Sequence, residues 1–147
     1  MGRLQKRLAI AGFFLALTSA VTASPSEGTG GLAPRVSRAL EDGSTSALAD
    51  LFPADRKVAV SLDRIADLSG FIGPGPLVEA LHRYLGERTD VRFDALAASE
   101  GARKGSERVK GTLVSRDRSG RRERVGLVFV FEHIDNAWRA VEVRETG

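Results

Sequence analysis

The side chains able to carry out acid–base or metal chemistry are few in this sequence. Its 147 residues include no cysteine and two histidines, His82 and His133, so disulfides and thiol catalysis are excluded. The histidines fall on different expected elements and form no His-x-x-His pair, so we predict no metal site and no cofactor. His82 follows Glu79 by three positions on a helix. This favours a surface histidine beside a carboxylate, with a pocket acid or base as the alternative.

Two other motifs lack the groups that catalysis or phosphate binding would need. Gly73-Pro74-Gly75-Pro76 precedes a helix, but phosphate loops donate backbone N–H groups and proline has none. We therefore predict a rigid turn. The single tyrosine, Tyr84, lies on the apolar face of that helix, which favours a core residue with its hydroxyl at the rim. No Gly-x-Ser-x-Gly nucleophile elbow is present.

The clearest charge feature is the segment 101–124, which carries nine basic and three acidic residues. Strand alternation places Arg108 and Lys110 on the outer face, opposite Val109. Our favoured interpretation is a solvated hairpin whose charges discourage edge pairing. The alternative is docking to an anionic surface, and no aromatic residue is available for stacking on single-stranded nucleic acid. The candidates for anion docking are Arg116, Arg118, Arg121, Arg122 and Arg124.

Residues 1–23 are typical of a general secretory signal peptide. Three bases precede an apolar run from Leu8 to Val21, and small residues follow. We predict cleavage after Ala23, with Ala20 as the alternative, because the run is shorter than the roughly 20 residues of a membrane span. Export to the periplasm or the exterior follows, with no transmembrane segment after cleavage. Residues 24–31 are typical of a flexible tether.

Removing this leader changes how the charge should be interpreted. The whole chain has 22 basic and 19 acidic residues, but three of the bases lie in the leader. The mature chain is therefore neutral, and the basic isoelectric point does not indicate a nucleic-acid partner. A neutral, cysteine-free domain must be stabilised by an ordinary hydrophobic core.

The hydrophobic periodicity of residues 32–147 changes from helical to alternating along the chain. This predicts a single α+β domain with about three N-terminal helices packed on an antiparallel sheet. The segment 63–71 fits either a loop with buried anchors or a short strand. A strand apolar on both faces, 122–133, should be central, and Gly126 suggests a bulge or bend. The expected helices span 32–43, 44–52 and 76–85, and the expected strands span 57–62, 91–98, 107–115, 122–133 and 137–144.

The chain resembles the nuclear-transport-factor-2-like superfamily, in particular its small exported bacterial domains of unknown function. The resemblance covers about Leu32 to Val143. It implies a cone-like fold in which a curved sheet encloses a cavity under the helices, and a tendency to dimerise through the outer face of the sheet. The matching segments are Ala47–Phe52, the strand Val58–Leu62, the helix Leu77–Leu85, Lys110-Gly111-Thr112-Leu113, the long apolar strand and Trp138-Arg139-Ala140-Val141.

Some members of that superfamily are enzymes, such as ketosteroid isomerase, and others are binding modules. Tyr84 does not match the isomerase pattern, so no catalytic residue is carried over. A homodimer is favoured by residues expected to be apolar and outward-facing, namely Val128, Val130, Val141 and Val143. A cone cavity would be lined by Val60, Tyr84, Phe93, Leu127, Phe129 and Trp138.

The leading hypothesis is an exported, non-catalytic binding or accessory domain whose ligand and partners are unknown. The first alternative is an enzyme or carrier that holds a small apolar molecule in the cone cavity. The second is docking to an anionic surface through the 103–124 hairpin.

Overall fold

Seven strands between Val58 and Thr146 form one curved sheet in the computed structural model, which describes residues 31–147. The predicted signal peptide (1–23) and all but the last residue of the predicted tether lie outside the described residues. The strand order is β2-β1-β7-β6-β5-β3, and the short β4 pairs with β5. The strands are β1 Val58–Leu62, β2 Leu68–Ile72, β3 Thr89–Ala95, β4 Ser99–Glu100, β5 Glu107–Arg116, β6 Arg122–Ile134 and β7 Ala137–Thr146.

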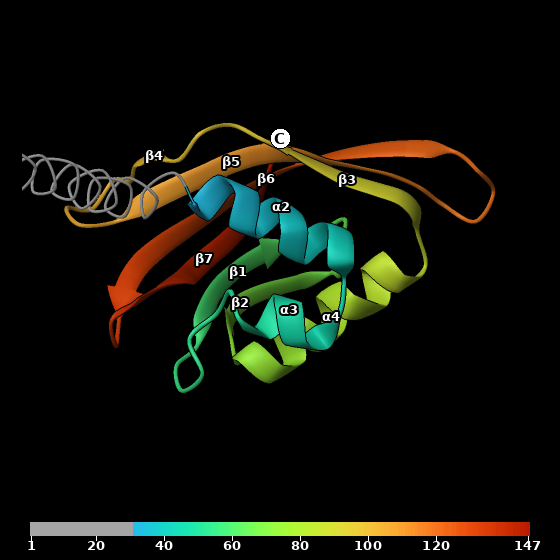
Figure 1. Ribbon diagram of the computed structural model, residues 1–147. Helices are drawn as coiled ribbons and strands as arrows, with labels where there is room; N and C mark the ends of the chain where they lie inside the picture. The colour runs from blue at the N-terminus through green and yellow to red at the C-terminus, as the bar shows by residue number, and fades with distance from the viewer. Residues whose placement is uncertain (1–30) are drawn as a thin grey trace, which may run out of the picture. The chain divides into compact units, whose positions relative to one another are not determined.

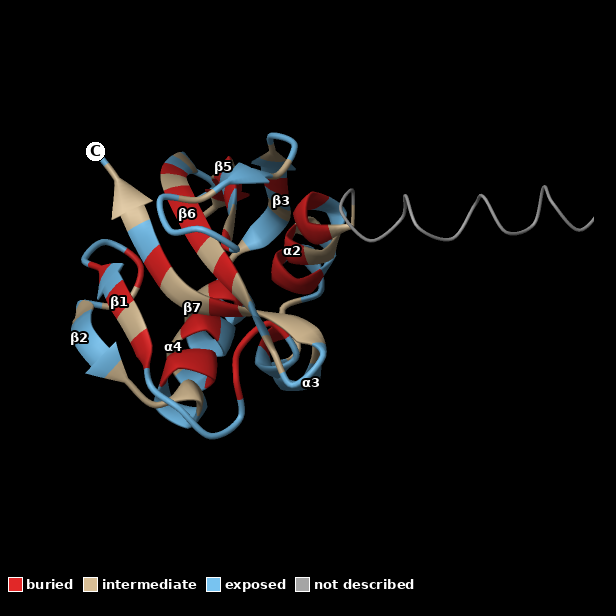
Figure 2. Cartoon of the chain, turned by 90° about the vertical axis from the view of Figure 1, so that its left-hand side faces the viewer, coloured by how far each residue is buried: buried red, intermediate tan, exposed pale blue. Residues whose placement is uncertain are grey.

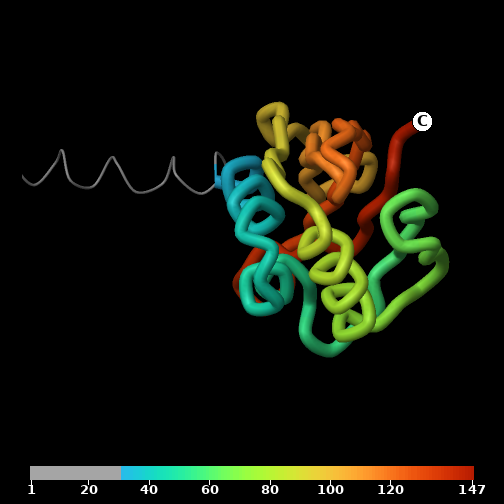
Figure 3. The backbone as a smooth tube through the Cα atoms, turned by 90° about the vertical axis from the view of Figure 1, so that its right-hand side faces the viewer, coloured from blue at the N-terminus to red at the C-terminus, as the bar shows by residue number. Residues whose placement is uncertain are grey.

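Three helices pack against the side toward which the sheet curves (Figure 1). They are α2 (Leu32–Asp42), α3 (Thr45–Ala49) and α4 (Pro74–Gly86). The Ser44 hydroxyl accepts a hydrogen bond from the Ala47 N–H and so caps α3. The helices α3 and α4 lie side by side, as the teal and yellow-green segments of Figure 3 show. The predicted α+β class and helical layer are therefore confirmed.

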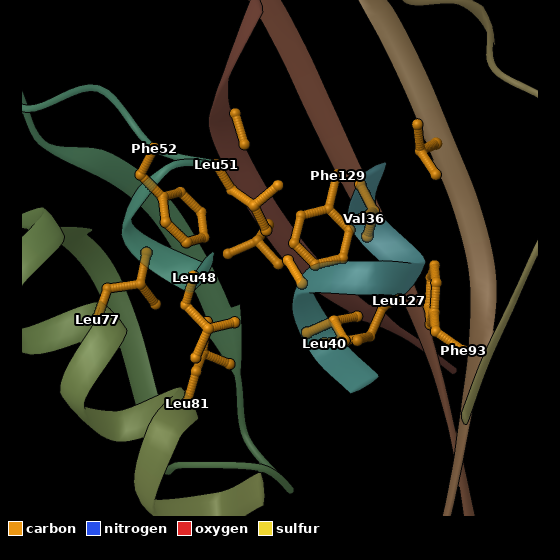
Figure 4. Packing of buried hydrophobic residues seen from close by; sticks show 14 of the residues in the cluster. Val36, Leu40, Leu48, Leu51, Phe52, Leu77, Leu81, Phe93, Leu127 and Phe129 are labelled. Carbon is orange, nitrogen blue, oxygen red and sulfur yellow. The ribbon is translucent and has the colours of Figure 1, made fainter. Parts of the chain in front are cut away.

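The core lies between the helices and the inner face of the sheet. Alternate residues of strands such as β1 and β6 point inward, which gives these strands the banded burial pattern of Figure 2. Figure 4 shows Phe129 and Leu127 of β6 facing Val36 and Leu40 of α2. The strand β6 runs between β5 and β7, so its predicted central position is confirmed.

One strand pairing differs from the expected antiparallel sheet. The strand β1 pairs in parallel with β7, because the chain passes through β2 and α4 before it enters the antiparallel meander. The ambiguous segment 63–71 contains both expected features. Ile65 is a buried anchor in the turn, and Leu68–Ile72 forms the edge strand β2.

Of the expected bulge or bend at Gly126 of β6, the bulge is absent. Gly126 keeps regular register opposite Thr112 and Thr146, and its lack of a side chain leaves room for the Thr146 hydroxyl. In the β6–β7 pair, the register shift lies between Val130 and Phe131, which pair with Glu142 and Ala140. This adds Val141 as an extra residue in β7.

The bulge also corrects the expected outward set of valines. Because Val141 is extra, strict alternation fails, and Val143 points into the core with 0% exposure. The prediction that Val143 faces outward is wrong. Val128, Val130 and Val141 are on the outer side, where Val128 is buried and the other two are half-buried.

Candidate binding face on the outer side of the sheet

The sheet separates basic side chains from acidic ones. On β5, the inward positions Val109 and Leu113 belong to the core, so Arg108, Lys110 and Arg116 point outward. The same alternation on β3, β6 and β7 adds further bases to this side. We call the outward residues of β3, β5, β6 and β7 the outer face, and its bases are Arg92, Arg108, Lys110, Arg116, Arg122, Arg124 and Arg144.

Two strand carboxylates point inward and are bound there. Glu123 of β6 forms an ion pair with Arg88, which follows α4. Glu145 of β7 accepts the backbone N–H groups of Arg64 and Ile65, each at 2.9 Å. These acids are therefore held away from the outer bases, and the positive charges of the outer face are not neutralised by them.

The acids that do lie on the outer side are each engaged by an arginine. Asp94 is 3.0 Å from Arg92, and Glu142 is 3.3 Å from Arg144. Glu132 forms an ion pair with Arg103 of the loop before β5. Asp90, near the start of β3, is 3.2 Å from Arg116. The seven bases named above outnumber these four acids, so an excess of positive charge is exposed on the outer face.

A groove of about 430 Å³ crosses this face at right angles to the strands. Its residues follow one cross-strand row, in which Arg108, Val130, Glu142, Ala59 and Phe71 are successive partners. We call it the cross-strand groove. It is lined by Arg56, Lys57, Ala59, Phe71, Ala102, Arg103, Ser106, Arg108, Val130, Glu132, Val141, Glu142 and Arg144.

Phe71 is the most unusual residue of the groove. Its side chain is 74% exposed, although it is a large apolar group in a strand. It lies on β2, an edge strand with no charged residue. The sequence offered the segment that ends at Phe71 as a loop with buried anchors or as a short strand, because the spacing of apolar residues does not distinguish a buried from an exposed phenylalanine.

The predicted anion-docking arginines divide into two groups. Arg116 and Arg122 are direct cross-strand partners, and Arg124 lies beside them on the outer face. Arg118 and Arg121 belong to the hairpin turn, where Arg121 is 3.9 Å from Asp117. Their role in docking stays a prediction.

The pair Arg116 and Arg122 lines a second hollow of about 460 Å³, together with Arg92. Like charges directly opposite on a sheet repel one another. Arg116 is held 3.2 Å from Asp90, which partly offsets this repulsion. The second hollow contains two acids, Glu41 and Asp90, and is less basic than the cross-strand groove.

The six residues predicted to line a cone cavity lie in or against the core. Four of them, Val60, Phe93, Leu127 and Phe129, are no more than 5% exposed and pack among other core side chains. Phe93 meets Phe129 edge to face, with ring centroids 6.1 Å apart. Tyr84 and Trp138 pack against the margin of this cluster. A ligand-lining role for the six stays a prediction.

Tyr84 is surrounded by polar groups that the sequence did not connect with it. The Arg88 guanidinium carbon lies over the ring, 4.3 Å from its centroid. Burial raises the pKa of Tyr84 above its usual value, the nearby Arg88 lowers it, and Glu123 raises it. The cluster joins α4 to β5 and β6, far apart in the chain, so no local spacing could reveal it.

Each of the two histidines contacts a neighbouring group of the fold, His82 a backbone carbonyl and His133 an indole ring. His82 Nδ1 lies 2.8 Å from the Gly43 carbonyl oxygen and joins α4 to the end of α2. His133 meets Trp138 edge to face across the β6–β7 hairpin, with ring centroids 5.2 Å apart.

Among residues 31–147, no cluster of three or more histidines and carboxylates is placed to hold a metal ion. Nor does that part of the chain contain a helix with the length and hydrophobicity of a membrane span.

Comparisons with known proteins find solved structures with a similar fold. No protein-family model and no curated protein matches the chain. A DUF4783 family protein from Bacteroides ovatus is 18% identical with a TM-score of 0.57, covering 75% of this chain and 89% of that one. An NTF2-like protein with a cystatin-like fold from Novosphingobium aromaticivorans is 18% identical, with a TM-score of 0.56 and coverage of 89% and 86%. An NTF-2 like protein of unknown function from Shewanella oneidensis is 11% identical, with a TM-score of 0.56 and coverage of 75% and 88%.

Proposed function

Because the chain has the cone fold of NTF2-like proteins, which by itself specifies no activity, we propose a function from its surface. The protein is an exported, non-catalytic binding domain that holds an anionic ligand on the outer face of its sheet. The observation that carries this proposal is the segregation of charge described above. Bases of four strands project outward, while Glu123 and Glu145 are bound on the inner side.

This arrangement favours an anionic ligand because neighbouring positive charges add their fields. Lys110 and Arg124 are exposed on the outer face and form no ion pair with any carboxylate of the part of the chain that the structure describes. Basic surfaces of this kind attract anions over distances set by the Debye length, about 8 Å at physiological salt. Binding should therefore weaken as salt rises.

The interior of the domain is filled by buried side chains, which favours a ligand site on the surface. Phe129 is 0% exposed, and Leu127 and Phe93 are 1% and 3% exposed. A ligand inside the cone would have to displace such side chains, at a cost in packing energy. A ligand on the outer face requires no rearrangement of the core.

Export is supported by the leader-like pattern of residues 1–23. The absence of cysteine is compatible with any redox environment, because no disulfide or free thiol is involved. We therefore place the anionic ligand in the periplasm or outside the cell.

The proposal is tested by binding of the protein, purified from the envelope fraction of its host, to immobilised heparin. We compare the double variant Lys110→Glu/Arg124→Glu with Arg38→Glu/Arg83→Glu, which changes the net charge equally on exposed positions of α2 and α4. We expect the first variant to elute at much lower salt and the second to elute as the wild type does. Equal losses in the two variants would mean that binding follows net charge alone, and the proposed face would be rejected.

A further inference from the structure

We infer that the cross-strand groove is a docking site for an extended acidic peptide that carries apolar side chains. The inference rests on the proposed function and deepens it, because it names the class of ligand and the part of the outer face that selects it. It is carried by three properties of the groove: its length, its apolar floor and its distribution of charge.

The length of the groove suits a short peptide. The row from Arg108 to Phe71 crosses five successive strands. Neighbouring strands lie about 4.8 Å apart, so the row spans roughly 19 Å, and an extended chain of about six residues covers that distance. The groove volume of about 430 Å³ gives room for side chains as well as backbone.

The floor and one end of the groove are apolar. Ala59, Val130 and Val141 are half-buried between the charged residues, and Phe71 stands at the edge-strand end with 74% exposure. Val141 reaches the outer side only because the bulge adds it to β7. An apolar side chain of a peptide could therefore bury surface against Phe71 and the valines, which a purely ionic ligand would leave exposed to water.

The groove is lined by more basic than acidic side chains. Five basic and two acidic residues line it. The acids Glu132 and Glu142 pair with Arg103 and Arg144. Arg56, Lys57 and Arg108 form no ion pair with any carboxylate of residues 31–147. Three positive charges are thus available to carboxylates of a ligand, at the two ends of an apolar floor.

The acids in the groove favour a peptide over an anionic membrane. A bilayer surface presents negative charge continuously and would bring it against Glu132 and Glu142, with like-charge repulsion. A peptide can place carboxylates opposite Arg56, Lys57 and Arg108 and apolar groups between them. The recessed floor is also reached more easily by side chains than by a flat surface.

The test uses fluorescence anisotropy with two labelled probes and the protein from its host's envelope. One probe is a short peptide in which glutamates alternate with leucines, and the other has serines in place of the leucines. We expect Phe71→Ala to weaken binding of the glutamate–leucine peptide about tenfold, as loss of one buried aromatic contact predicts. It should leave the weaker glutamate–serine peptide unaffected, and Arg108→Glu should weaken both.

Two matched variants act as controls. Leu96→Ala removes the other large exposed apolar side chain of residues 31–147, which is 63% exposed and lies outside the groove. Arg83→Glu reverses an exposed charge on α4, also outside the groove. Neither should change binding of the glutamate–leucine peptide by more than about twofold. Thermal melting of each variant checks that the exposed substitutions leave the fold intact.

The possible failures are distinguishable. If heparin binds through Lys110 and Arg124 but the glutamate–leucine peptide does not depend on Phe71, the peptide site is rejected and the proposed function stands. If neither heparin nor either peptide binds, the proposed function is rejected and the inference falls with it. If vesicles of phosphatidylglycerol bind in a Phe71-dependent manner and the peptides do not, the groove is a membrane contact and the inference is overturned. If analytical ultracentrifugation shows a dimer that Phe71→Ala dissociates, and the peptides do not bind, the groove is covered by a second copy of the chain through Val130 and Val141, and the inference is likewise overturned.

Discussion

Val141 and Val143 lie on opposite faces of the sheet although they are only two positions apart. The bulge opposite Val130 and Phe131 places Val141 in the outer groove and Val143 in the core. Beside the bulge, the Ala140 N–H donates to the Leu51 carbonyl oxygen at 2.6 Å, which attaches the segment after α3 to β7. The bulge therefore sets both the composition of the groove and an attachment of the helical layer.

This arrangement predicts unequal effects of the same substitution at the two valines. Val143→Ala removes buried methyl groups from a fully buried site and should lower the free energy of unfolding by about 2 kcal/mol. Val141→Ala should lower it by less than about 1 kcal/mol, because that residue is half-buried at the surface. Urea denaturation of both variants measures the difference, and equal losses would argue against the bulge.

A second prediction concerns Gly111, where β3 passes close to β5. A methyl group at this position would lie 2.6 Å from the Asp94 carbonyl oxygen and 2.7 Å from Cζ of Phe93. Because the first contact is with backbone, Gly111→Ala should destabilise the protein by roughly 2–3 kcal/mol.

Gly126→Ala is the matched control for this prediction. Its new methyl group would meet the Thr146 hydroxyl, and a rotation of that side chain can relieve the contact. The loss should be less than about 1 kcal/mol. Thermal or urea unfolding of the two alanine variants measures the difference in their free energies of unfolding. A mild effect at Gly111 would contradict the close approach of β3 and β5.

A third prediction follows from the environment of Tyr84. Burial raises the pKa of Tyr84 above the ordinary value of 10.0, and Glu123 adds to this while Arg88 opposes it. The raised pKa means that the folded protein holds the phenolic proton more tightly than the unfolded chain does. This contribution to stability is complete below pH 10.0 and is lost as the pH rises through the folded pKa.

The pKa of Tyr84 can be measured directly by absorbance, because Tyr84 is the only tyrosine in the chain. The ultraviolet absorbance of tyrosinate should titrate above pH 10.0, at a lower midpoint in Glu123→Gln and at a higher one in Arg88→Met. Tyr84→Phe should remove part of the loss of stability at high pH. A wild-type midpoint at or below the ordinary value would show that Tyr84 is solvated.

A fourth prediction concerns the turn of the β5–β6 hairpin. Asp117 Oδ1 accepts hydrogen bonds from the Ser119 hydroxyl at 2.6 Å and from the Arg121 N–H at 2.9 Å, and these lower the pKa of Asp117, the hydroxyl most of all. Its stabilising effect is present above pH 3.8 and is lost as the pH falls through the lowered pKa. Asp117→Ala should speed amide hydrogen exchange at Ser119 and Arg121, whereas Arg118→Ala, in the same turn, should not.

A fifth prediction tests the proposed export. The protein from the host's envelope should begin at Ser24, with Val21 as the alternative first residue if cleavage follows Ala20. Intact-mass measurement distinguishes the two. Recovery of the whole 147-residue chain from the cytosol would contradict export.

Local patterns in the sequence were sufficient to predict the helices and the antiparallel meander. Gly43 and Ser44 mark the boundary between α2 and α3, and alternation in 107–115 correctly placed Arg108 and Lys110 opposite the inward Val109. Such features depend on neighbours a few residues apart, and the physical preferences that produce them are visible in the sequence.

Features that depend on distant segments were not predictable in the same way. The parallel pairing of β1 with β7 joins residues such as Val60 and Val143 across most of the domain. The bulge reversed the expected direction of Val143, because one extra residue shifts all later positions of a strand. The groove required both features, so Phe71 and Arg144 were not associated with a common site.

The separation of charge across the sheet has a consequence for the unbound molecule. Residues 24–147 contain 19 basic and 19 acidic residues and so have no net charge, but a neutral body with bases on one side and acids bound on the other has an electric dipole. In the field of an anionic partner such a body rotates before contact, so that its basic side arrives first. Outer-face substitutions should therefore slow association at low salt, even where they leave the final contacts untouched.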